Sequence, residues 1–158
     1  MKKLTIIAII ALALGCSAGD DDANGHDHEH ANHMTENNVD PEVDVYADGL
    51  MKMGHEGNFH VMLMAANPAP PDVGENTWTI RVVDTDDNPI DGAKVTVTPF
   101  MPAHGHGTSP ADYTGTFTED GTYEVGPFDL FMPGVWETTV KVEGDVEDMA
   151  KFTFMLEG

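Results

Sequence analysis

Short runs of alternating or β-branched residues, separated by Gly, Pro, Asn and Asp, make up the chain from about Gly54 to its C-terminus. This pattern is typical of strands joined by tight turns, and no segment shows the period of an amphipathic helix. The predicted strands are 58–65, 76–84, 93–100, 113–119, 122–130, 135–143 and 146–156. An all-β fold is therefore expected.

Seven short strands in about 100 residues favour one architecture, a single immunoglobulin-like β-sandwich of antiparallel strands, placed at 51–158. The segments "DTDDNPIDG" (84–92) and "EDG" (119–121) supply turn chemistry between strands. Strand alternation predicts the following residues to face the core: Trp78, Ile80, Val82, Val95 and Val97. A domain of this size can bury a normal core without disulfides.

The N-terminus, "MKKLTIIAIIALALGC", combines two lysines with an apolar run from Leu4 to Leu14. The run is shorter than the about 20 residues that cross a bilayer, so residues 1–15 are predicted to be a signal peptide. Cys16 follows "ALG" and resembles the acylated cysteine of bacterial lipoproteins. We expect an exported protein, lipid-anchored to a bacterial membrane and facing the periplasm or the cell exterior.

Cys16 is the only cysteine, so once acylated it leaves no thiolate for catalysis or metal binding and no partner for a disulfide. The formal charge is 7 − 28 = −21, and removal of Lys2 and Lys3 with the signal peptide gives 5 − 28 = −23. Such a chain repels nucleic-acid phosphates and anionic lipid headgroups. Cations are its natural partners, and membrane contact is expected to come from the lipid.

Residues 16–50 are rich in Asp, Glu, Asn and His and poor in large apolar residues, which predicts a disordered acidic tether. Within the tether, "HDHEHANHM" offers a set of auxiliary metal ligands: His26, His28, His30 and His33. A tract of this kind binds Cu(II), Zn(II) or Ni(II) loosely and in several geometries. The alternative is a solvated low-complexity linker.

The segment "MPAHGHG" (101–107) is the main candidate metal site of the predicted sandwich. His-x-His in an extended segment places both imidazoles of His104 and His106 on one side, and Met101 adds a thioether. Two imidazoles with one or two thioethers suit Cu(I). The alternative is a polar loop whose histidines are solvated and whose methionine caps the core.

A second Met-Pro pair lies in "LFMPGVW" (130–136). If successive strands run antiparallel, the connection at 131–134 returns to the end, or pole, of the sandwich at which the strand 93–100 ends. The two Met-Pro segments are therefore predicted to be neighbours, with Met132 as a fourth ligand beside Met101, His104 and His106. The loop 66–75 is expected at the same pole.

A third cluster lies in "MKMGHEGNFHVMLM" (51–64), and the segment 49–57, which precedes the first predicted strand, is placed nearer the opposite end of the sandwich. His60, Met62 and Met64 share one face of the strand 58–65, and Phe59, Val61 and Leu63 share the other. One of these faces must be core, so packing is the favoured explanation for some of the methionines. His55 and Met51 are auxiliary ligand candidates.

No nucleophile elbow, phosphate-binding glycine loop or zinc-protease motif is present, and the carboxylates are spread as surface charge. We therefore expect a protein that is not an enzyme.

The ordered set of motifs over residues 57–156 resembles the YtkA-like domain family, which is related to the FixH-like proteins. The shared features are "GENTWTIRVVD", the "D-x-x-x-x-P-I-x-G-A-x-V" segment, Met-Pro with following histidines, and "F-x-M-P-G-x-W-E". The resemblance implies an immunoglobulin-like sandwich outside the cytoplasm, associated with copper handling and cytochrome oxidase assembly. It places the family motif on Met101, His104 and His106, and on Met132 with Trp136.

These observations predict an exported, lipid-anchored copper-binding protein for copper handling or delivery, with a cuproprotein or membrane protein as its partner. One alternative is an interaction module that docks a membrane-protein partner without any metal. Another is the scavenging of zinc or other metals by the His-rich tether.

Overall fold

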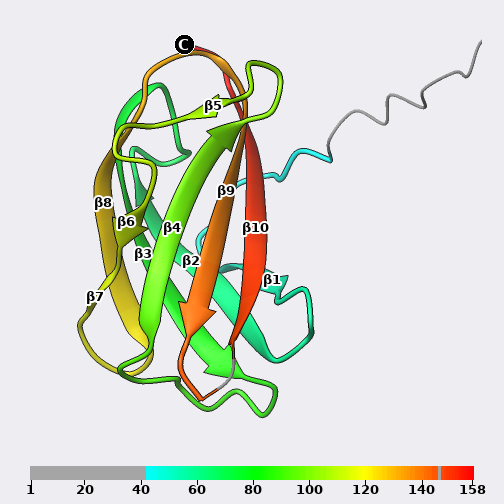
Figure 1. The fold of residues 1–158 in the computed structure, drawn as a ribbon, viewed down its shortest axis with the longest axis vertical. Helices are drawn as coiled ribbons and strands as arrows, with labels where there is room; N and C mark the ends of the chain where they lie inside the picture. The colour runs from blue at the N-terminus through cyan, green and yellow to red at the C-terminus, as the bar shows by residue number, and fades with distance from the viewer. Residues whose placement is uncertain (1–41, 146) are drawn as a thin grey trace, which may run out of the picture. The chain divides into compact units, whose positions relative to one another are not determined.

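The computed structural model describes residues 42–145 and 147–158, which form a sandwich of two antiparallel β-sheets without helices in that part of the chain (Figure 1). The predicted signal peptide, Cys16 and the four histidines of the predicted tether lie outside the described residues. The strands are β1 (Leu50–Met53), β2 (Phe59–Asn67), β3 (Gly74–Asp84), β4 (Lys94–Met101), β5 (His106–Gly107), β6 (Tyr113–Thr114), β7 (Thr116–Phe117), β8 (Thr122–Leu130), β9 (Gly134–Glu143) and β10 (Glu147–Leu156). The predicted all-β sandwich is confirmed.

The first sheet has the order β1-β2-β3-β8-β7, and the second has the order β10-β9-β4-β5, with β6 also paired to β4. Alternate residues of both sheets meet between the layers, as strand geometry requires. All five residues predicted to face the core are fully buried: Trp78, Ile80, Val82, Val95 and Val97. Trp78 packs edge-on against Phe128, Phe152 and Phe154 at ring-centroid distances of 5.4–5.8 Å.

The predicted strand 113–119 is instead two short strands that belong to different sheets. β6 pairs with β4, and β7 pairs with β8, so the chain crosses from one sheet to the other at Gly115. A Cβ at Gly115 would lie 3.3 Å from side-chain atoms of Tyr123, Val125 and Val95. The crossing therefore passes close to the core, where a side chain would be crowded.

Two strands were not predicted. β5 is formed by His106 and Gly107 within the turn region that follows β4. β1 lies in the segment 49–57, which the sequence pattern places ahead of the first strand, and it forms the edge of the first sheet beside β2.

The chain packs against the sandwich before β1 begins. Asp44 forms an ion pair with Lys52, and its carboxylate accepts a hydrogen bond from Thr153 N–H (2.8 Å). Tyr46 lies over Phe154 at 6.4 Å between ring centroids. The packed part of the chain thus starts ahead of residue 51.

Candidate metal centre

A tight turn of residues 102–105 joins β4 to β5. The carbonyl of Met101 accepts hydrogen bonds from His104 N–H (3.2 Å) and Gly105 N–H (3.0 Å). Gly105 has φ = 66°, a left-handed conformation that glycine adopts without steric cost. We call the end of the sandwich formed by this turn, β5 and the β8–β9 loop (131–133) the pole; Figure 1 shows these segments together with the C-terminus.

The turn brings the predicted ligands of the 101–107 segment together. Met101 and His106 are direct partners in the β4–β5 ladder, so their side chains share a face with Cβ atoms about 5 Å apart. The rings of His104 and His106 lie 5.7 Å apart between centroids. His104 is exposed, whereas His106 is half-buried.

The two Met-Pro segments are neighbours, as predicted. Gly134 has φ = 125°, and a Cβ placed there would lie 2.5 Å from the Met101 methyl carbon. Met101 is 1 % exposed and belongs to the core, and Met132 is partly buried against the core. The Met132 carbonyl accepts a hydrogen bond from Trp136 Nε1–H (3.0 Å), which fixes the β8–β9 loop.

Aromatic rings enclose His106. Its imidazole stacks on Phe131 at 5.3 Å and 18° and meets Trp136 edge-on at 6.3 Å and 68°. His106 Nδ1 is one of four buried side-chain nitrogen or oxygen atoms in the described residues that have no hydrogen-bond partner. A buried nitrogen without a partner is costly, and a bound cation would satisfy its lone pair.

Sequence reasoning missed the role of the aromatic residues. The sequence pattern gives Trp136 only as part of the family motif and gives Phe131 no role. Both flank the second Met-Pro pair in "FMPGVW", so their position beside a suspected ligand was the signal that could have identified them.

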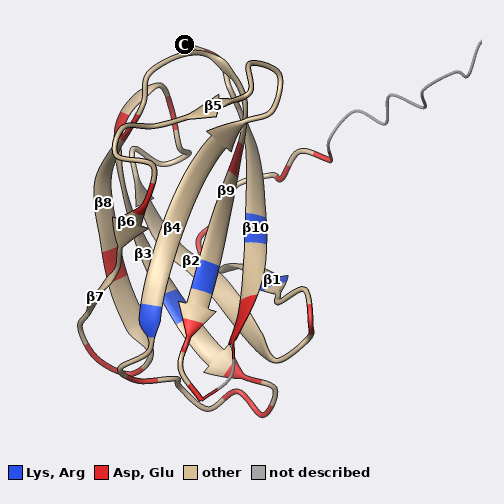
Figure 2. Ribbon diagram, viewed as in Figure 1, with Lys and Arg blue, Asp and Glu red and all other residues tan. Residues whose placement is uncertain are grey.

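The turn and the loop that form the pole have no Asp, Glu, Lys or Arg side chain. No Asp, Glu, Lys or Arg occurs at 99–111 or 131–136, and the β4–β5 turn is tan throughout in Figure 2. The nearest following carboxylate in the sequence, Asp112, accepts a hydrogen bond from the Thr98 hydroxyl (2.6 Å). No group of three or more His, Cys, Asp or Glu side chains suited to a metal occurs among residues 42–145 and 147–158. A site here would therefore depend on thioethers.

The third cluster has its core face on the odd-numbered residues of β2. Phe59, Val61 and Leu63 are fully buried, so His60 and Met62 project from the outer face of the first sheet. His55 lies beyond the end of β1, with its imidazole about 3.8 Å from the Glu56 carboxylate and mostly exposed. None of these side chains lies at the pole.

The fold and the pole together define a class: a small β-sandwich domain with an uncharged methionine–histidine cluster at one end. The family model described as YtkA-like matches residues 58–141, more than half of the chain, and the chain belongs to this family. No curated protein and no solved structure matches the chain. Within the described residues, no helix is long and apolar enough to span a membrane.

Proposed function

We propose that the pole binds Cu(I), with Met101, His104 and His106 as ligands and Met132 as the fourth. The observation that carries this proposal is His106: its Nδ1 atom is buried without a partner, its β-ladder partner is Met101, and the His104 ring lies 5.7 Å away.

The donor chemistry supports copper in its reduced state. Thioethers and imidazoles are neutral, soft to intermediate donors that favour Cu(I), whereas Zn(II) and Cu(II) sites of this kind usually add carboxylates or water. The pole has no carboxylate in its turn or its loop. The acidic remainder of the chain raises the local concentration of cations without supplying hard ligands at the pole.

We further propose where the protein acts. Residues 1–15 direct export, Cys16 carries the lipid, and the tether lifts the sandwich from a bacterial membrane while its histidines gather ions. The function is copper handling or delivery, with cytochrome oxidase assembly as one destination, and it includes no enzymatic step.

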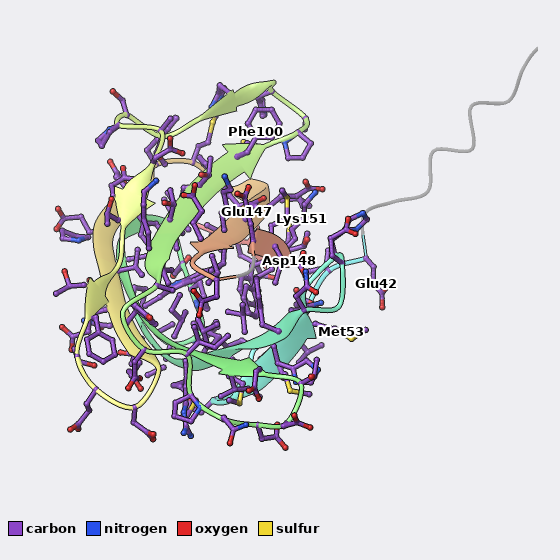
Figure 3. All side chains as sticks on the ribbon, turned by 60° about the horizontal axis from the view of Figure 1, so that its bottom comes forward. Glu42, Met53, Phe100, Glu147, Asp148 and Lys151 are labelled. Carbon is purple, nitrogen blue, oxygen red and sulfur yellow. The ribbon has the colours of Figure 1, made fainter. Side chains whose placement is uncertain are left out.

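A second candidate function is docking of a protein partner, because two large apolar side chains are exposed near the pole. Phe131, which stacks on His106, is 48 % exposed. Phe100, which precedes Met101 in β4 and is labelled in Figure 3, is 41 % exposed. Exposed aromatic residues of this kind are common at interfaces. In a delivery protein, docking and metal transfer would share this end of the molecule.

The proposal is tested by Cu(I) competition with a chromophoric chelator, using the full chain with His26, His28, His30 and His33 replaced by Asn. We expect one tightly held equivalent, and a loss of affinity of at least about 100-fold in the His104→Ala/His106→Ala double variant, because two of four ligands are removed. His55→Ala, which removes an exposed histidine away from the pole, serves as the matched control and should bind as tightly as the parent.

Binding that survives His104→Ala/His106→Ala would contradict the copper proposal and leave the pole as a docking surface. If instead the chain with its natural tether histidines loses nearly all binding when residues 20–34 are deleted, the tether alone scavenges metal. Mass spectrometry of the purified chain and of Cys16→Ser tests the lipid anchor separately, since only the former should carry the acyl mass.

A further inference from the structure

Three methionines and one histidine form a compact block on the outer face of β1 and β2. In the β1–β2 ladder Met51 is the direct partner of Met62, and Met53 is the direct partner of His60. Direct partners share a face with Cβ atoms about 4.5–5.5 Å apart, and residues i and i+2 of one strand share that face too. We call these four residues the methionine block.

Core packing does not explain the block. The opposite face of β2 supplies the buried residues, whereas Met51 is 53 % and Met53 is 64 % exposed. Met62 and His60 are half-buried, and Met53 projects away from the ribbon in Figure 3. Methionine is usually a buried residue that fills gaps in cores, so thioethers gathered on an exposed sheet face require another reason.

The histidine of the block has the same feature as the histidine of the pole. Of the imidazole nitrogens in the described residues, His60 Nδ1 and His106 Nδ1 are the two that are buried without a hydrogen-bond partner. In each case the direct partner across the ladder is a methionine, Met53 or Met101. The same pair of donors, a thioether beside an unsatisfied imidazole nitrogen, therefore occurs twice in one small domain.

The surroundings of the block select a soft monovalent ion. The four donors are neutral, and none is a carboxylate, which disfavours Mg²⁺, Ca²⁺ and Mn²⁺. Lys52 lies between Met51 and Met53 on β1, but strand alternation points its side chain to the other face, where it is paired with Asp44. Arg81, the β3 partner of Met62, donates a hydrogen bond from its guanidinium to the Asp120 carboxylate at 2.8 Å. Both cations are thus paired with carboxylates.

We propose that Met51, Met53, His60 and Met62 form a second site for a soft monovalent metal ion, Cu(I) or Ag(I), on the outer face of the first sheet. This site stands on its own donors and does not depend on metal binding at the pole. Met64 is not part of this site, because the β2–β3 ladder shifts register between Leu63 and Ala65. A depression of about 430 Å³, lined by Met53, His55 and Met149 among others, adjoins the block and gives an ion open access.

The test is protection of thioethers from oxidation. The full chain is treated with hydrogen peroxide in chloride-free buffer, with and without Ag(I), and the sulfoxide at each methionine is quantified by peptide mass spectrometry. Exposed thioethers oxidise readily, and a thioether bound to silver does not donate its lone pair to peroxide. We expect Ag(I) to slow oxidation of Met51, Met53 and Met62 by roughly tenfold, and to leave Met155, which is 52 % exposed on β10, unchanged.

Variants separate the block from the pole in the same experiment. His60→Gln and Met62→Leu should each abolish most of the protection at the remaining block methionines and leave protection of Met132 as in the parent. The His104→Ala/His106→Ala variant should lose the protection of Met132 and keep the protection of the block methionines. Circular dichroism confirms that each variant is folded, and Met62→Leu preserves side-chain volume in case His60→Gln disturbs the strand.

Three results would overturn the proposal. The first is that the block methionines oxidise at the same rate with and without Ag(I). The second is protection that persists in both His60→Gln and Met62→Leu. The third is protection confined to Met53 and Met149, which would place the ion in the adjoining depression with His55 instead. If Ag(I) protected the block methionines of the parent chain but not Met132, the result would contradict metal binding at the pole and would leave the proposal for the block unaffected.

Discussion

The pole and the methionine block both set a methionine opposite a histidine across an antiparallel strand pair, yet their surroundings differ. At the pole, Phe131 and Trp136 enclose His106, and Met101 is 1 % exposed. On the sheet face, Met51 and Met53 are more than half exposed, and no ring pair involving His60 occurs within the described residues. The methionine–histidine pair is thus enclosed by other side chains at the pole and open to solvent in the methionine block.

The difference teaches what each site would be suited to. Groups that orient a ligand and exclude water around a site commonly change metal affinity by about 10–100-fold. An enclosed pole therefore favours tight, specific binding, and an open block favours weaker binding with rapid exchange. A chain that acquires copper on its face and retains it at its pole would need both properties.

The largest expected effect comes from Gly134→Ala, which breaks the contact between the two Met-Pro segments. Its Cβ would lie 2.5 Å from the Met101 methyl carbon at a φ of 125°, so Met101 must move. We expect the free energy of unfolding to fall by about 2 kcal/mol, from backbone strain and core disturbance together. Chemical denaturation measures this change, and Cu(I) affinity at the pole should weaken while Ag(I) protection of the block stays constant.

Gly49→Ala is the matched control for Gly134→Ala. Gly49 has φ = 80°, but a Cβ there meets no atom within 4 Å, so this variant isolates the cost of the backbone conformation, about 1 kcal/mol. Equal destabilisation by the two substitutions would mean that the Met101 contact contributes nothing.

Much of the fold could be predicted from the sequence because strand alternation and turn residues act locally. The strand 122–130 has the predicted bounds, and Trp78, Ile80 and Val82 face the core as expected. The proximity of the Met-Pro segments also followed from strand counting, since antiparallel connections alternate between the two ends of a sandwich. These features need only the order of the strands.

The missed features depend on which strands pair. "LMKM" has no β-branched residue and a lysine among its four positions, so β1 had no strand signal of its own, although all four of its residues pair with residues 60–63 of β2. Because the sequence did not predict β1, it did not indicate that Met53 pairs with His60 or that Met51 pairs with Met62, and the methionine block could not be predicted. The stacking of Phe131 on His106 likewise depends on side-chain packing between loops.

Phe131→Ala tests enclosure at the pole directly and has an intermediate expected effect. The stacked ring at 5.3 Å holds the imidazole and shields it, and aromatic pairs of this kind contribute about 0.5–1.5 kcal/mol. Cu(I) affinity should therefore weaken by roughly three- to tenfold in the competition assay. Phe117→Ala is the control, because Phe117 is 41 % exposed and lies 5.5 Å from Tyr123 on the first sheet. Equal affinities of the two variants would show that enclosure by Phe131 has no part in binding.

Asp148→Asn gives the smallest expected effect and concerns the turn that follows β1. The Asp148 carboxylate accepts hydrogen bonds from Glu56 N–H (2.9 Å) and Asn58 N–H (3.1 Å), which ties the β1–β2 turn to the start of β10. Burial raises the pKa of Asp148, but the backbone N–H groups of Glu56, Asn58 and Met149 outweigh burial and hold the pKa below its ordinary value. Asn keeps one acceptor oxygen but loses the charge, so we expect a loss of about 0.5–1 kcal/mol near neutral pH.

The pH dependence of that loss identifies its cause. A carboxylate whose pKa is lower in the folded state stabilises the fold fully above the unfolded-state pKa of about 4, and this contribution disappears as the pH falls through the folded-state pKa. The difference in unfolding free energy between the parent and Asp148→Asn should therefore be constant from about pH 5 to pH 7 and shrink below about pH 4. A difference that persists unchanged at pH 3 would mean that the shape of the side chain, and not its charge, holds the turn. Because this turn leads from Met53 on β1 to His60 on β2, the substitution should also reduce Ag(I) protection of the block while leaving Met132 protected.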